Sequence, residues 1–599
     1  MNRVRPLSTA LSAFLSVFAH PNEIAAAQDP SSARTYDIWQ VVRKCVDSGA
    51  VDPKWSGQEP STGWSAVVLL RREGKVIGVG QAHGVDNPIR VATEQAIAAA
   101  RVAREPSWRQ LTVEIELGEA PVPAVGSDYS QAGTEIDPAL EGAAVRRGNA
   151  WMLAHPAVLQ ALDAAGAPEQ TFLSLVMQHG LPAREFAEIP ASERVALAQF
   201  SATRIVQPTP DAGPVLVHRG ARLRRMPTAA ESPALARATA TAIAQWFERS
   251  MIPAANDMEA LGLRGDYEPS EARDNPIAAP PAEQALAAYA LARFSQVLGI
   301  SETSRAGARR TAVAILAALG RTIDTEADPL ADARARAFIV LAHATLGATI
   351  DEPSAGGTLA RNVIGLLAHD AQRKGGDALE TASTLAAMAM LERTGHGVVP
   401  RAELRAMVDA AWDAPDRARL LGVLDWLIIA DRELGDPTDS HAALARTVRM
   451  ALARAQLGMS GDGPAVLPDL VGAFSLSGVG GRGASGQSAR PGHALALMLA
   501  DPSFTPVGEQ FRARAMQIAL LRFLDQLAYD EVACYLCPDP RRALGALRTA
   551  PWDSTVAVAG NAMALLCLSE TADALDRINS ALPSVESSEG RAPSRPDAP

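Results

Sequence analysis

The feature that most constrains this chain is a change of hydrophobic pattern near residue 230. From there to about residue 582, apolar residues recur at helical spacing, and Gly, Pro and Asp interrupt them at regular places. The pattern predicts a first helix over 234–251 and then paired helices over 282–298 with 302–319, 330–346 with 359–369, 378–393 with 401–412, 417–434 with 442–456, 492–499 with 509–527, and 554–568 with 571–582. Six hairpins of similar length predict a stacked helical array that can close into a ring.

One helix of most pairs consists almost wholly of small apolar residues, as in 285–292 and 386–391. Such a helix suits a position that is packed on every side, whereas its partner carries Arg and Glu on one face and suits the outside. We therefore expect 230–583 to be an all-α helical-hairpin domain, of the (α/α)6 toroid type, with the apolar helices innermost.

The preceding region, 36–208, has a mixed pattern. Its strand and helix periods alternate without the rhythm of parallel βαβ units, which predicts an α+β module. The strand over 111–117 alternates Leu-Thr-Val-Glu-Ile-Glu-Leu, which predicts one solvated face. The other expected elements are a hairpin of 65–70 with 75–79, a helix over 89–102, a hairpin of 143–145 with 151–154, helices over 159–164 and 169–179, and a strand over 197–205. Residues 209–229 are expected to be a connector, with a strand-like stretch over 214–224.

Composition supports a multidomain globular protein. The chain has 599 residues, of which 48% are hydrophobic and 21% charged, so it can form more than one core. Its formal net charge of −11 argues against a nucleic-acid partner. A tail over 584–599, rich in Ser, Pro and acidic residues, is expected to be disordered.

The N-terminus has the three-part pattern of an export signal. Arg3 and Arg5 precede an apolar stretch over 7–19, and three alanines over 25–27 offer a cleavage site. We therefore expect 1–27 to be a signal peptide and the mature protein to be periplasmic or secreted. The alternative is a short amphipathic leader on a cytoplasmic protein. No later segment is apolar enough to predict a membrane-spanning helix.

Three local patterns suggest chemistry only weakly, and no cofactor or metal is predicted from them. Cys534 and Cys537 have CxxC spacing, but without a second such pair the four cysteines are expected to be buried small hydrophobes or a local disulfide. The glycines over 478–483 match a dinucleotide motif without its preceding strand, so 475–491 is expected to be a flexible loop. The alternating acids over 324–328 lack the Gly and Glu of a calcium loop and predict a solvated turn.

The order of elements in the first module resembles the AMMECR domain family. The resemblance lies in the hairpin over 63–80, the Ala-rich helix over 92–101, the strand and Pro-containing turn over 111–121, and the second hairpin and helix over 140–181. The family signature is Leu-Arg-Gly-Cys-Ile-Gly, whereas this chain has Ile77 and Val79 at the Arg and Cys positions. Since a thiolate cannot act from Val79, the resemblance implies a scaffold or binding surface here.

Two segments of the second region resemble the squalene-cyclase and prenyltransferase-type toroid superfamily. They are Gly-Asp-Tyr-Glu-Pro over 265–269 and Pro-Trp-Asp-Ser over 551–554. The chain lacks an Asp-x-Asp-Asp motif, and only 5% of its residues are aromatic, too few to line a carbocation cage. Terpene cyclisation is therefore not expected.

If the second region is a toroid, ligands should bind where the inner helices begin. Carboxylates and aromatic platforms are the equipment of a glycosidase or lyase. Candidate catalytic acids are Asp425, Asp530, Glu531 and Asp553, and candidate ligand-binding residues are His493, Tyr535, Trp426, Trp552 and His83. The alternatives are that Asp530 and Asp553 are helix caps or turn residues, and that His83 is an ordinary surface histidine.

Two functions remain open at this point. The preferred one is a non-catalytic binding or scaffold protein with an unidentified protein or polysaccharide partner. The other is a secreted, glycosidase- or lyase-like enzyme that acts on a carbohydrate or lipid-like substrate. Two acids about 5 to 10 Å apart in a deep cleft would favour the enzyme. Dispersed acids would favour the scaffold.

Overall fold

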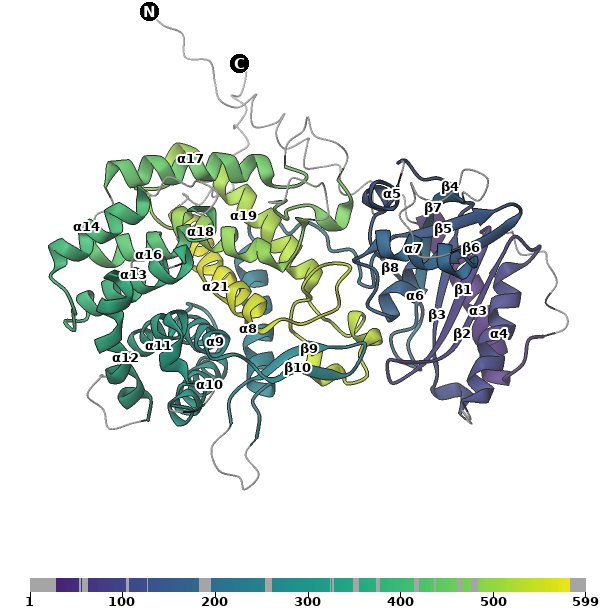
Figure 1. Ribbon diagram of the computed structural model, residues 1–599, viewed down its shortest axis with the longest axis horizontal. Coiled ribbons are helices and arrows are strands. Elements are labelled where there is room, and N and C mark those ends of the chain that lie inside the picture. The colour runs from purple at the N-terminus through teal and green to yellow at the C-terminus, as the bar shows by residue number, and fades with distance from the viewer. Residues whose placement is uncertain are drawn as a thin grey trace, which may run out of the picture.

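The structure is a computed structural model, and it describes residues 29–581 except 53–54, 56–62, 104–106, 127, 182–194, 254–260, 324, 326–327, 348–354, 373–376, 414–419, 436–437, 460–465 and 476–482. Figure 1 shows two parts side by side, a sheet with flanking helices in purple and blue and a larger helical part in teal to yellow. The predicted order, an α+β region followed by a helical region, is confirmed.

The first part is built on one antiparallel sheet. Its strands run in the order β2-β1-β3-β7-β5-β6, with β4 and β8 also paired to β7. Central strand β7 has eleven residues and pairs with β3 at one end and with β5 at the other. The bounds are β1 Ser65–Arg72, β2 Lys75–His83, β3 Thr112–Gly118, β4 Val122–Pro123, β5 Glu141–Arg147, β6 Ala150–Ala154, β7 Ala196–Val206 and β8 Val215–Val217.

Helices cover both ends of this sheet. Helix α4 (Pro88–Val102) packs closely on β2, because Gly78 and Gly80 leave room for it: an ideal Cβ at Gly80 would lie 1.8 Å from the carbonyl oxygen of Ala92. The remaining helices are α3 (Asp29–Ser48), α5 (Tyr129–Glu135), α6 (Pro156–Ala161) and α7 (Pro168–Gln178). Both predicted hairpins are present, and the first turns through Glu73 and Gly74, whose φ angles are +48° and +75°.

Two features of the first part differ from the sequence prediction. Strand β8 lies inside the expected connector 209–229, so the sheet extends beyond the predicted boundary at residue 208. The connector strand is held because its apolar residues Val215 and Val217 pack with Val206 and with Tyr535 of the helical part. Helix α3 was not predicted at all.

The second part contains six helices that pack in succession. Helix α9 packs on α11, α11 on α13, α13 on α16, α16 on α18 and α18 on α21, and α21 packs on α9. Helices α8, α10, α12, α14, α17 and α19 flank this set. The bounds are α8 Ser232–Arg249, α9 Pro281–Phe294, α10 Glu302–Arg321, α11 Ala333–Thr345, α12 Ala355–Gln372, α13 Ala378–Arg393, α14 Arg401–Trp412, α16 Leu424–Leu434, α17 Asp439–Ala455, α18 Ala489–Leu499, α19 Val507–Leu527 and α21 Val558–Ala581.

Burial follows the division that the sequence predicted between apolar and one-sided helices. Ten successive residues of α13, from Ala382 to Leu391, are buried. Flanking helix α14 buries only Leu404, Val408 and Trp412, which lie four residues apart on one face. Small side chains allow the apolar helices to approach each other from several sides.

Two predictions for this region are wrong. The expected pair 554–568 and 571–582 is the single helix α21, because the polar residues between them bond within the helix: the Ser569 hydroxyl donates to the Leu565 carbonyl (2.7 Å) and that of Thr571 to the Cys567 carbonyl (2.6 Å). The flanking neighbour of α21 is α8, from the start of the region. The region is also not purely helical, because β9 (Arg264–Glu268) and β10 (Arg273–Ala278) form a hairpin.

The structure also places the local patterns that suggested chemistry only weakly. All four cysteines lie within the described residues, are buried, and form no disulfide. Helix α18 begins at Ala489, inside the expected loop 475–491, and residues 476–482 of that loop lie outside the described residues. Asp328 caps a short 3-10 turn. Asp324, Glu326, the expected signal peptide and the expected tail lie outside the described residues. In the part of the chain that the structure covers, no helix has the length and apolarity to cross a membrane.

Candidate functional site

The polar face of β3 is buried, contrary to the expected solvated face. Glu114 and Glu116 are at most 1% exposed. All four of their carboxylate oxygens have protein donors. Glu114 accepts from Arg71 Nε (2.9 Å) and from the Tyr535 hydroxyl (3.1 Å), and Glu116 accepts from Arg204 Nε (3.0 Å) and pairs with His155 Nδ1 (3.0 Å). Buried carboxylates of this kind are stable only when they are paired and hydrogen-bonded.

Electrostatics keep Glu116 ionised. Burial alone would raise the pKa of Glu116, but the Arg204 guanidinium and the hydrogen bond to His155 lower it below its ordinary value. Burial also raises the pKa of the Tyr535 hydroxyl, so this group stays protonated and donates to Glu114. Glu116 is therefore a fixed charge, and the buried tyrosine that donates to Glu114 comes from the other part of the molecule.

Tyr535 belongs to a junction that joins the two parts of the chain. Its ring lies under Arg71, with the guanidinium carbon 5.5 Å from the ring centre. The first hairpin turn approaches the same segment so closely that an ideal Cβ at Gly74 would lie 2.4 Å from the Cys537 carbonyl. We name the six residues Arg71, Glu114, Glu116, His155, Arg204 and Tyr535 the junction cluster.

The connector adds a second set of charged contacts. The fully buried Arg219 pairs with Asp469 (3.1 Å) and stacks on the ring of Trp552, 5.6 Å away. Its backbone carbonyl accepts from Arg548 (2.8 Å). Further along, Arg224 pairs with Asp530 at 2.8 Å. The connector is thus bonded to the helical part and is no free linker.

Three of the predicted site residues meet inside the helical core. His493 Nδ1 of α18 lies 3.1 Å from Asp425 Oδ2 of α16, and both side chains are 1% exposed. The Trp426 ring stands edge-on to the His493 ring, with centroids 6.2 Å apart, and is fully buried. These residues lie near helix starts as expected, but the pair is enclosed and holds α16 to α18.

The other predicted residues are dispersed. Asp530 caps a 3-10 turn through the N–H of Ala533 (2.8 Å), and Glu531 is exposed. For Asp553 the alternative was a helix cap or a turn residue. It accepts from the N–H of Thr555 (2.9 Å) and is a turn residue, whereas the first N–H of α21 donates to Asp266 (2.8 Å). The reason is that α21 begins four residues later than the predicted helix.

His83 stands apart from all of these residues, on the sheet. Its ring lies 5.4 Å from that of Trp64. Partial burial and the nearby His155 lower the pKa of His83, so it is neutral at neutral pH.

A pocket of about 350 Å³ lies among the six successive helices, near the C-terminal ends of α9, α11, α13, α16 and α18 and beside the middle of α21. Each of the six contributes side chains to it. The charged ones are Arg293 of α9, Arg393 of α13, Arg432 and Glu433 of α16, and Glu570 and Asp573 of α21. The others are Tyr289, Gln296, Ala344, Thr345, Met390, Ile429 and Leu497. We name this cavity the axial pocket.

Most charges of the axial pocket are paired. Arg293 donates to Glu570 Oε1 (2.5 Å) and to Asp573 Oδ2 (2.7 Å), and Arg393 pairs with Glu433. Burial alone would raise the pKa of Glu570, but Arg293 lowers it to about 2. Glu570 is therefore ionised at any physiological pH and cannot serve there as a general acid.

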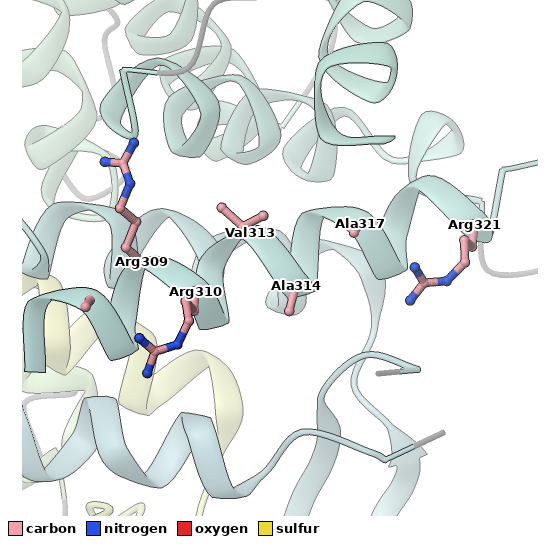
Figure 2. A pocket seen from close by; sticks show the side chains of 7 residues that line it. Arg309, Arg310, Val313, Ala314, Ala317 and Arg321 are labelled. Carbon is pink, nitrogen blue, oxygen red and sulfur yellow. The ribbon is translucent and has the colours of Figure 1, made fainter. Parts of the chain in front are cut away.

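A second hollow lies along the exposed side of α10 (Figure 2). Its lining comes from that one helix and includes Arg309, Val313 and Arg321, whose side chains spread along the helix rather than converge. It therefore lacks the convergent polar groups of a binding site. Within the described ranges, no group of three or more His, Cys, Asp or Glu side chains could hold a metal ion.

Sequence reasoning missed the axial pocket because it searched the opposite ends of the helices. A signal was present. Tyr289 and Arg293 stand four residues apart in an otherwise apolar helix, and Glu570 and Asp573 stand three apart in another, so each pair shares a face. Charged residues that share one face of a largely buried helix mark such a cavity.

Comparison with known proteins adds little. No family model matches the chain, and no curated protein matches it. Among solved structures, the chain is similar to the uncharacterised protein PH0010 from Pyrococcus horikoshii, with 17% identity and a TM-score of 0.25 over 31% of this chain and 97% of that one. A likeness at this level carries no functional argument.

Proposed function

We propose that this chain is an exported, non-catalytic binding or scaffold protein whose two parts act as one unit. The observation that supports this most strongly is the junction cluster. A catalytic carboxylate needs an oxygen that is free to reach substrate, whereas all four oxygens of Glu114 and Glu116 accept from protein donors. The His-Asp pair among the predicted site residues, His493 with Asp425, is enclosed as well.

The proposal includes an AMMECR-type first module that acts as a surface. Its support is the order of hairpin, helix, strand, second hairpin and helices, together with Val79 at the position of the family cysteine. Val79 is 42% exposed and offers no nucleophile. Export is supported by the charged, apolar and small-residue segments of 1–27.

For the second part we propose a closed (α/α)6 toroid. Its support is the succession of packed helices from α9 through α11, α13, α16 and α18 to α21, which also contacts α9. The proposal predicts that α8, from the start of the region, completes the outer layer beside α21. A ring closed by its first and last helices holds its ends together without a linker.

The test is an assay of the full-length protein on polysaccharides and lipid esters, with reducing ends, unsaturated products and free acids as readouts. We expect no turnover. We also expect affinity electrophoresis in gels that contain single polysaccharides to reveal retarded migration if the partner is a glycan. Turnover that disappears in Asp425→Asn or Asp553→Asn would overturn the proposal.

One observation favours a carbohydrate-active enzyme as the second candidate. At the junction, crowding by surrounding protein and the carboxylate of Asp553 raise the pKa of the surface residue Asp163 to about 6. Trp552 offers an aromatic platform beside them, with its ring 3.7 Å from an ideal Cβ at Gly166. An acid of raised pKa next to a second carboxylate is the equipment of a glycosidase. Loss of hydrolysis in Asp163→Asn alone would support this candidate.

A further inference from the structure

The axial pocket contains two opposite charges that the protein leaves incompletely paired. Glu570 uses Oε1 for Arg293, while its buried Oε2 has no hydrogen-bond partner. Across the pocket, Arg432 has no ion-pair partner within the described residues, although its charge acts on both Glu570 and Tyr289. A buried charged oxygen without a donor is costly, so a ligand that supplies one is favoured.

We propose that the axial pocket binds a small zwitterion, namely a free α-amino acid with an apolar side chain. The ligand ammonium donates to Glu570 Oε2, and the ligand carboxylate accepts from Arg432. Glu570 is 5% exposed, so it is a buried, oriented acceptor and not a surface carboxylate. This inference goes beyond the proposed function and does not depend on it.

Helix ends favour the ammonium at this place. Helices α9, α11, α13 and α16 end beside the pocket, and the carbonyl end of a helix carries partial negative charge. Arg293, Arg393 and Arg432 lie in the last turns of their helices and offset part of this charge. Two of these three are neutralised by carboxylates, so Arg432 alone remains to meet a ligand anion.

The rest of the lining fits an apolar side chain. Met390, Ile429 and Leu497 are each at most 6% exposed and face a cavity of about 350 Å³. That volume is at the small end of the range for ligand pockets, which suits an amino acid better than an oligosaccharide. Burial raises the pKa of the Tyr289 hydroxyl, which therefore remains a neutral group that can donate to the ligand carboxylate.

The experiment uses the full-length chain and three probes of one carbon skeleton. They are L-leucine, 3-methylbutan-1-amine, which lacks the carboxylate, and 4-methylpentanoate, which lacks the ammonium. Isothermal titration calorimetry should detect the binding of L-leucine, and each single-charge probe should bind with an affinity lower by about tenfold or more. Thermal-shift measurements with all twenty amino acids accompany it, since any zwitterion that raises the Tm at about 10 mM identifies the preferred side chain.

Variants connect binding to the pocket. Arg432→Gln should weaken the binding of L-leucine by about tenfold or more, because the carboxylate contact is lost, and should not weaken the binding of the amine probe. Arg309→Gln, the same change on the exposed side of α10, should bind as the wild type does. Circular dichroism checks that both fold. The proposal is overturned if no amino acid shifts the Tm, if the three probes bind equally, or if the two variants behave alike.

Discussion

Two of the buried ionic clusters in the molecule differ in whether every carboxylate oxygen has a donor. In the junction cluster, both oxygens of Glu114 and both of Glu116 have donors. In the axial pocket, Glu570 keeps one oxygen without a donor, and Arg432 has no ion pair inside the described part of the chain. A cluster whose carboxylate oxygens all have donors holds two parts together, whereas a buried carboxylate oxygen without a donor leaves a place for a ligand.

The largest effect is expected from breaking the paired cluster. Glu116→Ala leaves Arg204 buried without its carboxylate, which should lower the free energy of unfolding by about 3–5 kcal/mol. Urea denaturation followed by circular dichroism measures it. Glu531→Ala removes an exposed carboxylate and should change stability by less than about 0.5 kcal/mol. Equal effects of the two variants would show that the junction does not depend on this pairing.

The next effect tests the incompletely paired cluster through pH. Because the pKa of Glu570 falls from 4.5 to about 2 on folding, its stabilisation is complete above about pH 4.5 and is lost as the pH falls toward 2. Glu570→Gln should cost about 1.5–3 kcal/mol at pH 7, where a charged hydrogen bond is lost. The difference from the wild type should shrink at low pH. A difference that is constant with pH would contradict this assignment.

A smaller effect is expected from changing the shape of the junction rather than its charge. Gly74→Ala places a Cβ 2.4 Å from the Cys537 carbonyl at a φ of +75°, and should cost about 1–3 kcal/mol. Gly148→Ala is a matched control, because its φ is +59° but nothing lies within 4 Å of the added Cβ. The Tm of Gly74→Ala should therefore be the lower of the two. If Gly74→Ala and Gly148→Ala have the same Tm, the close contact between the Gly74 turn and the helical part does not contribute to stability.

The smallest effect concerns Asp163, outside both clusters. Its pKa rises from 3.8 to about 6 on folding, so its charge disfavours the folded state above pH 6 and has no effect well below 3.8. Asp163→Asn should raise the Tm slightly at pH 7.5 and leave the Tm unchanged near pH 3. The increase is small because Asp163 is exposed and water screens its charge. A Tm that falls at pH 7.5 would contradict the repulsion from Asp553.

Sequence reasoning located most helices and strands, because these depend on local periodicity. The helix over 378–393 was predicted with the bounds of α13, and 401–412 with those of α14. The error at 571 arose because Ser569, Glu570 and Thr571 look like a break in sequence, while two of them bond back to the same helix and the third pairs with Arg293. The strands of hairpin β9–β10 were not predicted, because they lie in a region whose overall pattern is helical.

The candidate site was predicted only in fragments. Asp425, Trp426 and His493 do meet, but their burial depends on which helices are neighbours, and periodicity carries no such information. Arg293 and Glu570 are 277 positions apart in sequence and 2.5 Å apart in space. Their pairing, and hence the axial pocket, depends on long-range packing alone.

The sequence by itself determined two regions of different period, the apolar character of the successive helices and the one-sided pattern of those around them. These properties follow from side-chain spacing along a regular backbone. Only the tertiary structure decided that the polar face of β3 is covered, that the connector contributes a strand to the sheet, and which charges remain incompletely paired. Pairing of buried charges depends on the approach of distant segments, since the free energy of a charge is set by the groups that replace its water.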